Sequence, residues 1–131
     1  MEETKPTLLI TQSLSDEQLN LLKSLAKDIE VEYHPSKTWD EISEDQWRTV
    51  NMLLTHRVLP PVEKAPNLRW IQTTLSGVDH WAESGWLDQS GVTITTSSGV
   101  PSLAVAEHVI GMFLALGHRF QELFRLQEKS E

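Results

Sequence analysis

Three short polar segments carry residue types that bind small anions. The first is Leu75–His80, with the sequence Leu-Ser-Gly-Val-Asp-His. Its glycine has no Cβ, so a ligand can approach the backbone closely, and successive amides at Ser76, Gly77 and Val78 could together bind a carboxylate. An ordinary turn has the same composition, so the residues alone leave both interpretations open.

The other two segments also follow predicted strands. Thr55-His56-Arg57 places a guanidinium where it could hold an anion, although an exposed arginine in such a place is more often simply solvated. Residues 95–100, Thr-Thr-Ser-Ser-Gly-Val, precede a long helical pattern, and the free amides and positive dipole at a helix start favour anions. All three segments could therefore bind a small anion, and the residues alone do not decide between this and an ordinary structural role.

Other chemistries find less support in the sequence. Asp79 next to His80 suggests a general acid–base pair, but adjacent side chains on a turn usually diverge, and packing of His80 and Trp81 over the loop is the simpler interpretation. The five histidines lack metal-ligand spacing, and there is no cysteine. The six glycines form no Gly-x-Gly-x-x-Gly motif, and Ile10–Ser13 lacks the acidic cluster of a signalling receiver domain. We predict no metal site and no catalytic residue in this chain.

A repeat of short strand, polar turn and helix must position these segments. Apolar or alternating runs predict strands at residues 7–10, 29–33, 51–55, 68–74 and 92–95. Ser15 and Ser43 each stand three residues before a glutamine, which is the pattern of an N-terminal capping box. Strands joined through helices imply a parallel sheet. The sequence thus predicts an α/β fold, a flavodoxin-like, doubly wound parallel five-stranded sheet in the order 2-1-3-4-5.

A long helix is predicted over residues 101–129. Pro101 suits a first helical turn, and Gly111 and Gly117 are the only breakers that follow it. The apolar residues of this segment spread over more than one face, and a wide exposed apolar surface normally marks an interface. We therefore expect the helix to pack on a second domain or subunit, with an ordinary core helix as the alternative.

Charge and composition disfavour several classes of partner. The chain has 131 residues and a formal net charge of −8, with 39% hydrophobic and 23% charged residues, which is ordinary for a folded domain. A surplus of acids repels phosphate backbones and anionic lipids, so we expect neither nucleic acid nor a membrane as partner. No signal-peptide pattern opens the sequence, and the lack of cysteine fits a reducing compartment. We expect a cytoplasmic location.

Taken together, the segments resemble the D-isomer-specific 2-hydroxyacid dehydrogenase family. The resemblance lies in the order and spacing of residues 65–72 (Ala-Pro-Asn-Leu-Arg-Trp-Ile-Gln), 76–80, 91–95 (Gly-Val-Thr-Ile-Thr) and 105–108 (Val-Ala-Glu-His). It extends from Leu53 to Arg119, whereas the first 50 residues match by fold alone. The region from Thr73 to Trp81 looks closest to glyoxylate and hydroxypyruvate reductase-like members.

The resemblance implies an NAD(P)-dependent enzyme that interconverts D-2-hydroxy acids and 2-oxo acids such as glyoxylate or hydroxypyruvate. In this family a flavodoxin-like substrate domain is joined through a long helix to a Rossmann domain, and the helix also contributes to dimerisation. Loop amides that match Ser76, Gly77 and Val78 grip the substrate carboxylate. The helix start borders the nicotinamide, which makes Ser102 and Val105 expected cofactor-edge residues.

The family's carboxylate-clamping Arg, its Glu–His pair and its glycine motif lie in the Rossmann domain, outside these residues. We therefore expect residues 1–100 to form the substrate-binding domain and 101–131 to lead toward a missing NAD(P)-binding domain. The implied partners are a small 2-oxo or 2-hydroxy acid, that domain, and a second copy bound through the 101–129 helix.

The implied cofactor is NAD or NADP in the full-length enzyme, without tight binding to this chain, and we expect the chain alone to be inactive. The alternative is a stand-alone small-carboxylate-binding or dimerisation module without enzymatic activity.

Overall fold

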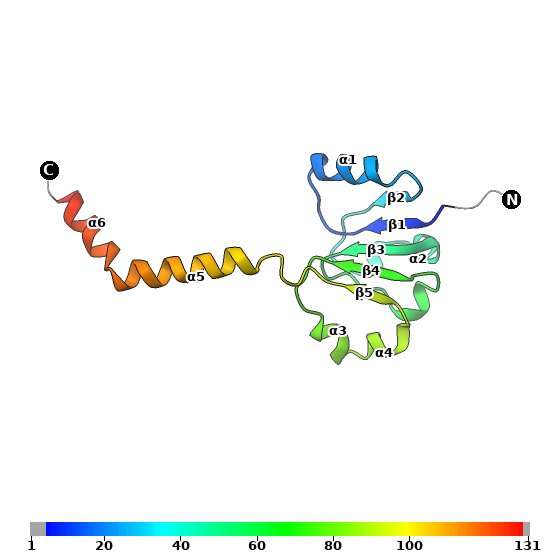
Figure 1. Ribbon diagram of the computed structural model, residues 1–131. Helices are drawn as coiled ribbons and strands as arrows, with labels where there is room; N and C mark the ends of the chain where they lie inside the picture. The colour runs from blue at the N-terminus through cyan, green and yellow to red at the C-terminus, as the bar shows by residue number, and fades with distance from the viewer. Residues whose placement is uncertain (1–4, 130–131) are drawn as a thin grey trace. The chain divides into compact units, whose positions relative to one another are not determined.

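The computed structural model describes residues 5–129, which divide into two compact units, 5–97 and 98–129. The first unit is built on one parallel sheet (Figure 1). Neighbouring strands are all parallel and lie in the order β2-β1-β3-β4-β5. This confirms the predicted fold class and strand order. The strands are β1 (Thr7–Ile10), β2 (Glu30–Tyr33), β3 (Val50–Thr55), β4 (Trp70–Thr73) and β5 (Thr93–Thr95).

Two of the connecting helices begin at the predicted caps. α1 (Asp16–Leu25) begins after Ser15, whose side chain accepts a hydrogen bond from the Gln18 amide, while the Gln18 side chain accepts one from the Ser15 amide. α2 (Glu44–Thr49) begins after Ser43, which accepts from the Gln46 amide. The remaining short helices are η1 (Trp39–Glu41), η2 (Val62–Lys64), α3 (Asp79–Glu83) and α4 (Trp86–Ser90).

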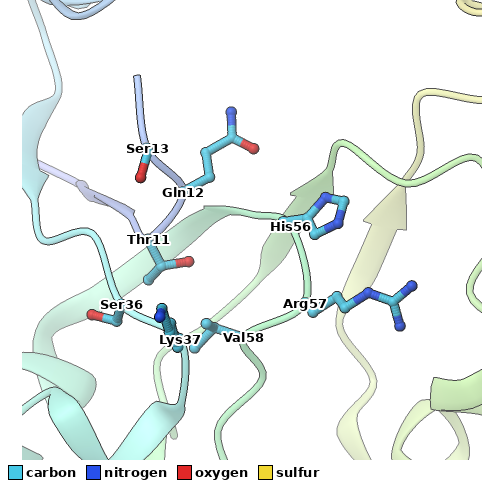
Figure 2. Close-up of a pocket in the computed structure, with 8 residues that line it drawn as sticks. All are labelled: Thr11, Gln12, Ser13, Ser36, Lys37, His56, Arg57 and Val58. Atoms are coloured by element: carbon cyan, nitrogen blue, oxygen red, sulfur yellow. The ribbon is translucent and has the colours of Figure 1, made fainter. Parts of the chain in front are cut away.

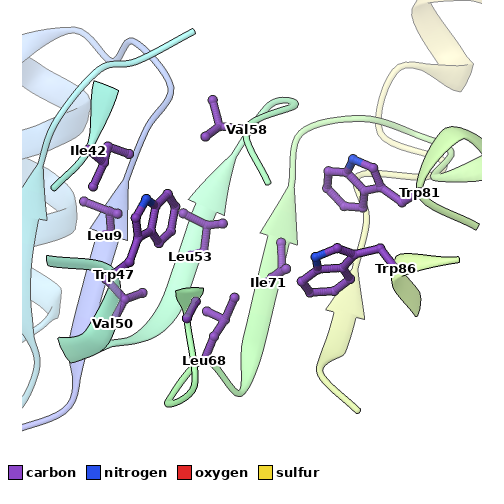
Figure 3. Packing of buried hydrophobic residues seen from close by; sticks show 11 residues of the cluster. Leu9, Ile42, Trp47, Val50, Leu53, Val58, Leu68, Ile71, Trp81 and Trp86 are labelled. Carbon is purple, nitrogen blue, oxygen red and sulfur yellow. The ribbon is translucent and has the colours of Figure 1, made fainter. Parts of the chain in front are cut away.

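One face of the sheet carries the apolar core (Figure 3). Leu9, Leu53 and Ile71 occupy matching register positions on β1, β3 and β4, and all three are fully buried. Because alternate residues of a strand point to opposite faces, these three share a face. The tryptophans of α2, α3 and α4 belong to the same buried cluster, so these helices cover that face: Trp47, Trp81 and Trp86.

Two of the three buried indoles, those of Trp47 and Trp86, have hydrogen-bond partners. A buried tryptophan requires an acceptor for its N–H. Trp47 Nε1 donates to the Trp39 carbonyl at 2.9 Å, and Trp86 Nε1 donates to the Pro60 carbonyl at 2.8 Å. Each bond joins a helix to a segment outside it, η1 for Trp47 and the loop at Pro60 for Trp86, so the core and the segments around it are held together.

The opposite face of the sheet is more exposed on β4 and β5. Ile10 on β1 is fully buried, whereas Trp70 on β4 keeps 41% of its surface exposed. The Trp70 indole donates to Thr95 Oγ1 at 2.8 Å, and that hydroxyl lies 2.6 Å from Gln72 Oε1. This half of the face is therefore a polar surface with one aromatic ring set into it.

The second unit corrects the prediction of one helix over residues 101–129. It contains two helices, α5 (Ser102–Gly117) and α6 (Phe120–Glu128), bent by 60° at the break between them. Arg119 stands at the break with φ of 54°, a left-handed conformation that ends helical hydrogen bonding. Gly117, where α5 ends, weakens a helix by about 1 kcal/mol relative to alanine.

Among the described residues, no single helix is both long and apolar enough to cross a membrane. α5 and α6 reach that length and composition only when they are taken together across their bend.

Trp47 is the largest fully buried side chain among the described residues. We expect Trp47→Ala to lower the free energy of unfolding by about 3–5 kcal/mol, because truncation leaves a cavity in a closed core. Trp39→Ala is the control, since its side chain is 36% exposed and the carbonyl that accepts from Trp47 is retained. Urea denaturation followed by circular dichroism measures both variants. Equal losses for the two would contradict this packing.

Candidate functional site

A pocket opens at the carboxyl ends of β1, β2 and β3. β1 lies between β2 and β3, so the chain runs outward in opposite directions from this point of the sheet. In open α/β sheets, ligands bind outside the carboxyl ends of strands at such a switch point. The pocket has a volume of about 440 Å³ and is lined by Thr11, Gln12, Ser13, Ser36, Lys37, His56, Arg57 and Val58 (Figure 2).

Buried threonine hydroxyls hold the strand ends together. Thr11 and Thr55 are 2% and 0% exposed, and Thr11 Oγ1 donates to Thr55 Oγ1 at 2.8 Å. The Thr55 hydroxyl also accepts from the Val58 amide at 2.9 Å. This pair joins the end of β1 to the end of β3 and fixes the course of the loop that contains His56 and Arg57.

A third buried threonine ties the loop after β3 to the loop after β4. The Thr73 hydroxyl donates to the His56 carbonyl at 2.9 Å and accepts from the Leu75 amide at 3.1 Å. Thr74 Oγ1 also lies 2.9 Å from His56 Nδ1. Thr73 and Thr74 both contact His56, so the segment after β4 starts from a defined position beside the pocket.

The predicted carboxylate-binding loop follows directly. Ser76 and Gly77 are exposed and Val78 is half-buried. Within residues 5–129 no hydrogen bond uses the backbone amides of these three residues, so the amides are available to a ligand. A Cβ added to Gly77 would lie 3.2 Å from Asp79 Oδ2, so a side chain at this position requires the exposed Asp79 carboxylate to move by a few tenths of an ångström.

The remaining predicted residues have separate outcomes. Ser102 and Val105 lie in the first two turns of α5, in the second unit, and their role at the cofactor edge stays a prediction. His80 packs against Trp81, with ring centroids 5.2 Å apart, as the packing interpretation predicted. No hydrogen bond or ion pair joins it to Asp79 within residues 5–129. That same part of the chain contains no cluster of three or more His, Cys, Asp or Glu residues that could hold a metal.

Sequence reasoning missed one side of the pocket. Ser36 and Lys37 follow β2 and were not singled out, and Gln12 and Ser13 were considered only for their lack of acidic residues. All four line the pocket with Arg57. The sequence does contain polar residues just beyond the ends of β1 and β2. Their position becomes informative only when the strand order places those ends beside the end of β3.

The residues that build this edge belong to a segment with known relatives. A model of the D-isomer specific 2-hydroxyacid dehydrogenase family, catalytic domain, matches residues 8–124. The chain belongs to this family. A glyoxylate reductase from Thermofilum pendens (strain DSM 2475 / Hrk 5) is 30% identical over 125 residues, which cover 90% of this chain and 36% of that protein.

Solved structures share the fold of this 2-hydroxyacid dehydrogenase domain. A D-isomer specific 2-hydroxyacid dehydrogenase family protein from Aeromonas salmonicida subsp. salmonicida A449 matches with a TM-score of 0.67 at 24% identity, over 96% of this chain and 40% of that one. A protein from Pyrococcus horikoshii OT3 matches with a TM-score of 0.68 at 21% identity, over 98% and 39%. The chain thus spans about two fifths of the length of these relatives.

The Thr73 hydroxyl supplies a test of how the edge is held. We expect Thr73→Val to lower the free energy of unfolding by about 1–3 kcal/mol, because it leaves the His56 carbonyl and the Leu75 amide unpaired. Amide hydrogen exchange at Leu75 should accelerate, measured by NMR. Thr93→Val, at an exposed position on β5, is the control. Unchanged exchange at Leu75 in Thr73→Val would show that this hydroxyl does not hold the loop.

Proposed function

We propose that this chain is the substrate-binding part of an NAD(P)-dependent oxidoreductase acting on the CH–OH group of D-2-hydroxy acids. Its reaction in the reducing direction would take 2-oxo acids such as glyoxylate or hydroxypyruvate. The observation that carries the proposal is the set of uncommitted amides at residues 76–78, at the carboxyl edge of a domain of this family. Similarity to a glyoxylate reductase over 90% of the chain supports the substrate class.

The loop amides would bind and orient the substrate. Backbone N–H groups donate charge-assisted hydrogen bonds to a carboxylate, and they do not titrate, so this grip is insensitive to pH near neutrality. The anchored residue Leu75 fixes the start of the loop, so a carboxylate held by the next three amides has a defined position. The 2-oxo carbon beside it is thereby presented in one orientation, which reduces the entropy cost of the reaction.

The cofactor would be held by another domain. NAD or NADP supplies the hydride when bound, but no Gly-x-Gly-x-x-Gly motif is present in this sequence. The residues of this chain therefore do not make a dinucleotide site on their own. We place the cofactor in a nucleotide-binding domain of the full-length enzyme, with Ser102 and Val105, both exposed on α5, at its edge. Residues that transfer the proton would also belong to that domain.

A second candidate function is a small-carboxylate-binding module without enzymatic activity. The free amides at 76–78 would serve it equally well, and the apolar helices α5 and α6 would dimerise. It differs from the first in needing no nucleotide-binding domain, and the family match over residues 8–124 favours the enzyme.

Binding of a substrate analogue tests the loop assignment. Oxamate is a stable monoanionic analogue of a 2-oxo acid, and we expect its addition to shift the amide NMR signals of Ser76, Gly77 and Val78 most. Gly77→Val should weaken oxamate binding by about tenfold or more, because the added side chain crowds the loop. Gly111→Ala in α5, where an added Cβ meets nothing within 4 Å, should bind like the unmodified chain. Shifts confined to other residues would refute the loop assignment.

We also propose that α5 and α6 bind a second copy of the chain. Phe113, Leu103 and Leu116 are 80%, 71% and 66% exposed, and many other large apolar side chains of these helices are exposed with them. Large exposed apolar side chains in such number normally belong to an interface. Both helices contribute to it, since Phe120 and Phe124 of α6 are exposed as well and lie edge to face, 6.3 Å apart.

Light scattering measures this self-association. We expect the chain to be dimeric at micromolar concentration and Phe113→Glu to weaken the dimer by about tenfold or more, because a carboxylate would have to be desolvated in the interface. Leu25→Glu is the matched control, since Leu25 is 76% exposed on α1, and it should leave the dimer unchanged. A strict monomer, or equal effects of the two variants, would contradict the proposal.

A further inference from the structure

The hydrogen-bond ladder between β4 and β5 changes its pattern just beyond the ends of the two strands. Inside the regular register, the Thr93 amide donates to the Arg69 carbonyl at 3.0 Å. Because the bonds of a parallel ladder are evenly spaced, the same spacing would lead the Ser97 amide to the Thr73 carbonyl. The Ser97 amide donates instead to the Leu75 carbonyl at 2.9 Å. Ser97 thus reaches farther along the segment after β4 than a regular ladder would.

The hydroxyl of Ser97 replaces the ladder bond that its amide does not make. Ser97 Oγ donates to the Thr73 carbonyl at 3.2 Å. That carbonyl also accepts from Gln72 Nε2 at 2.8 Å. Ser97 therefore serves two carbonyls, with its side chain at Thr73 and its backbone at Leu75. A hydroxyl on Cβ is needed for this arrangement, and only serine and threonine have one.

The bond to Leu75 also acts on the first amide of the predicted carboxylate-binding loop. The Leu75 carbonyl and the Ser76 amide belong to one peptide group, and no peptide bond within residues 5–129 is cis. A trans peptide is planar, so its C=O and N–H point in opposite directions. Holding the Leu75 carbonyl toward Ser97 therefore directs the Ser76 N–H away from Ser97. A hydrogen bond to the carbonyl also polarises the peptide, which makes its N–H a stronger donor.

Contacts from the β3 side hold the same segment at other atoms. The Thr74 amide donates to the Thr55 carbonyl at 3.0 Å, and the Leu75 amide donates to the Thr73 hydroxyl at 3.1 Å. These bonds place the chain as far as the Leu75 amide. The orientation of the next peptide depends on the Leu75 carbonyl, which bonds to Ser97.

We propose that Ser97 is a positioning residue for the carboxylate-binding loop. Its hydroxyl occupies the Thr73 carbonyl, which leaves its amide to hold the Leu75 carbonyl and thereby to aim the Ser76 N–H at the substrate. The proposal rests on the proposed function, since it assumes that the loop binds a carboxylate. Ser97 acts through the Leu75–Ser76 peptide, so this role needs no contact between Ser97 and the substrate.

The role of the hydroxyl can be tested without a ligand. In Ser97→Ala we expect the amide of residue 97 to leave the Leu75 carbonyl and to bond to the Thr73 carbonyl, as in a regular ladder. NMR detects the present bond as a scalar coupling between the amide nitrogen of residue 97 and the carbonyl carbon of Leu75. The coupling should be present in the unmodified chain and in Ser97→Thr and absent from Ser97→Ala. A coupling that persists in Ser97→Ala would overturn the proposal.

Oxamate binding measures the consequence for the loop. Ser97→Ala should weaken oxamate binding by about threefold to tenfold, the range expected for one misdirected hydrogen bond, and Ser97→Thr should restore it. Ser24→Ala is the matched control, because the Ser24 hydroxyl also donates to a carbonyl, that of Leu21 on α1, at 2.7 Å. It should bind oxamate like the unmodified chain. Unchanged affinity in Ser97→Ala would contradict the proposal.

The unmodified chain offers a second measurement that does not depend on the folding of a variant. Coupling between two sites is reciprocal, so a carboxylate bound at the loop should strengthen the Ser97 bond. We expect saturation with oxamate to slow hydrogen exchange at the Ser97 amide, measured by NMR. The Thr93 amide, inside the regular ladder, should exchange at the same rate with and without oxamate. Equal exchange at Ser97 in both conditions would also overturn the proposal.

The two proposals fail in distinguishable ways. If oxamate shifts the amides of residues 76–78 and Ser97→Ala binds it equally well, the positioning role alone is rejected. If oxamate shifts none of those amides, the proposed function is rejected, and the positioning role is rejected with it.

Discussion

At the carboxyl edge of the sheet, buried threonine hydroxyls must find partners inside the protein, because no water reaches them. A buried hydroxyl without a partner costs about 1–3 kcal/mol. The hydroxyls of Thr11 and Thr55 hydrogen-bond to each other. The Thr73 hydroxyl hydrogen-bonds to the His56 carbonyl after β3 and to the Leu75 amide after β4. The loops that carry His56, Arg57 and Ser76 are consequently held by the strands beneath them. The register of the sheet therefore determines the position of each loop of the candidate site.

The same register separates the core from the site. Leu9, Leu53 and Ile71 form a row across three strands, and the buried threonines stand at the next position toward the carboxyl ends on the same face. The apolar row packs against the tryptophans of the covering helices, which stabilises the sheet. The apolar core stops at the row of buried threonines. Beyond that row, the loop amides at 76–78 and the charged side chains of Lys37 and Arg57 lie at the surface. The residues that stabilise the sheet thus lie directly beside those that position the candidate site.

The second unit has a different physical character. Large apolar side chains of α5 and α6 are exposed along both helices, so the unit cannot be stabilised by burial among its own residues. The break at Arg119 divides the apolar surface into two helical faces bent by 60°. A partner that covers this surface must therefore fit a bent pair of helices, which is a more specific shape than a single straight helix.

Local patterns in the sequence were sufficient for much of the fold. The capping serines at 15 and 43, the apolar strand runs and the strand order were all predictable, because each depends on residues within a few positions or on general rules of chain connection. The loop at 76–78 was also singled out, through its glycine and its place after a strand, and its role in binding a carboxylate stays a prediction. The family resemblance, carried by the spacing of several such segments, was confirmed by the match over residues 8–124.

Tertiary structure decided the rest. The pocket joins Lys37, Arg57 and Gln12 from three segments after three different strands, and only the pairing of the sheet makes those segments neighbours. The end of α5 was equally hidden, because Gly117 can be tolerated inside a helix and Arg119 is not a residue that favours the left-handed conformation. Sequence spacing records which residues follow one another along the chain, whereas a binding site depends on which strand ends lie side by side.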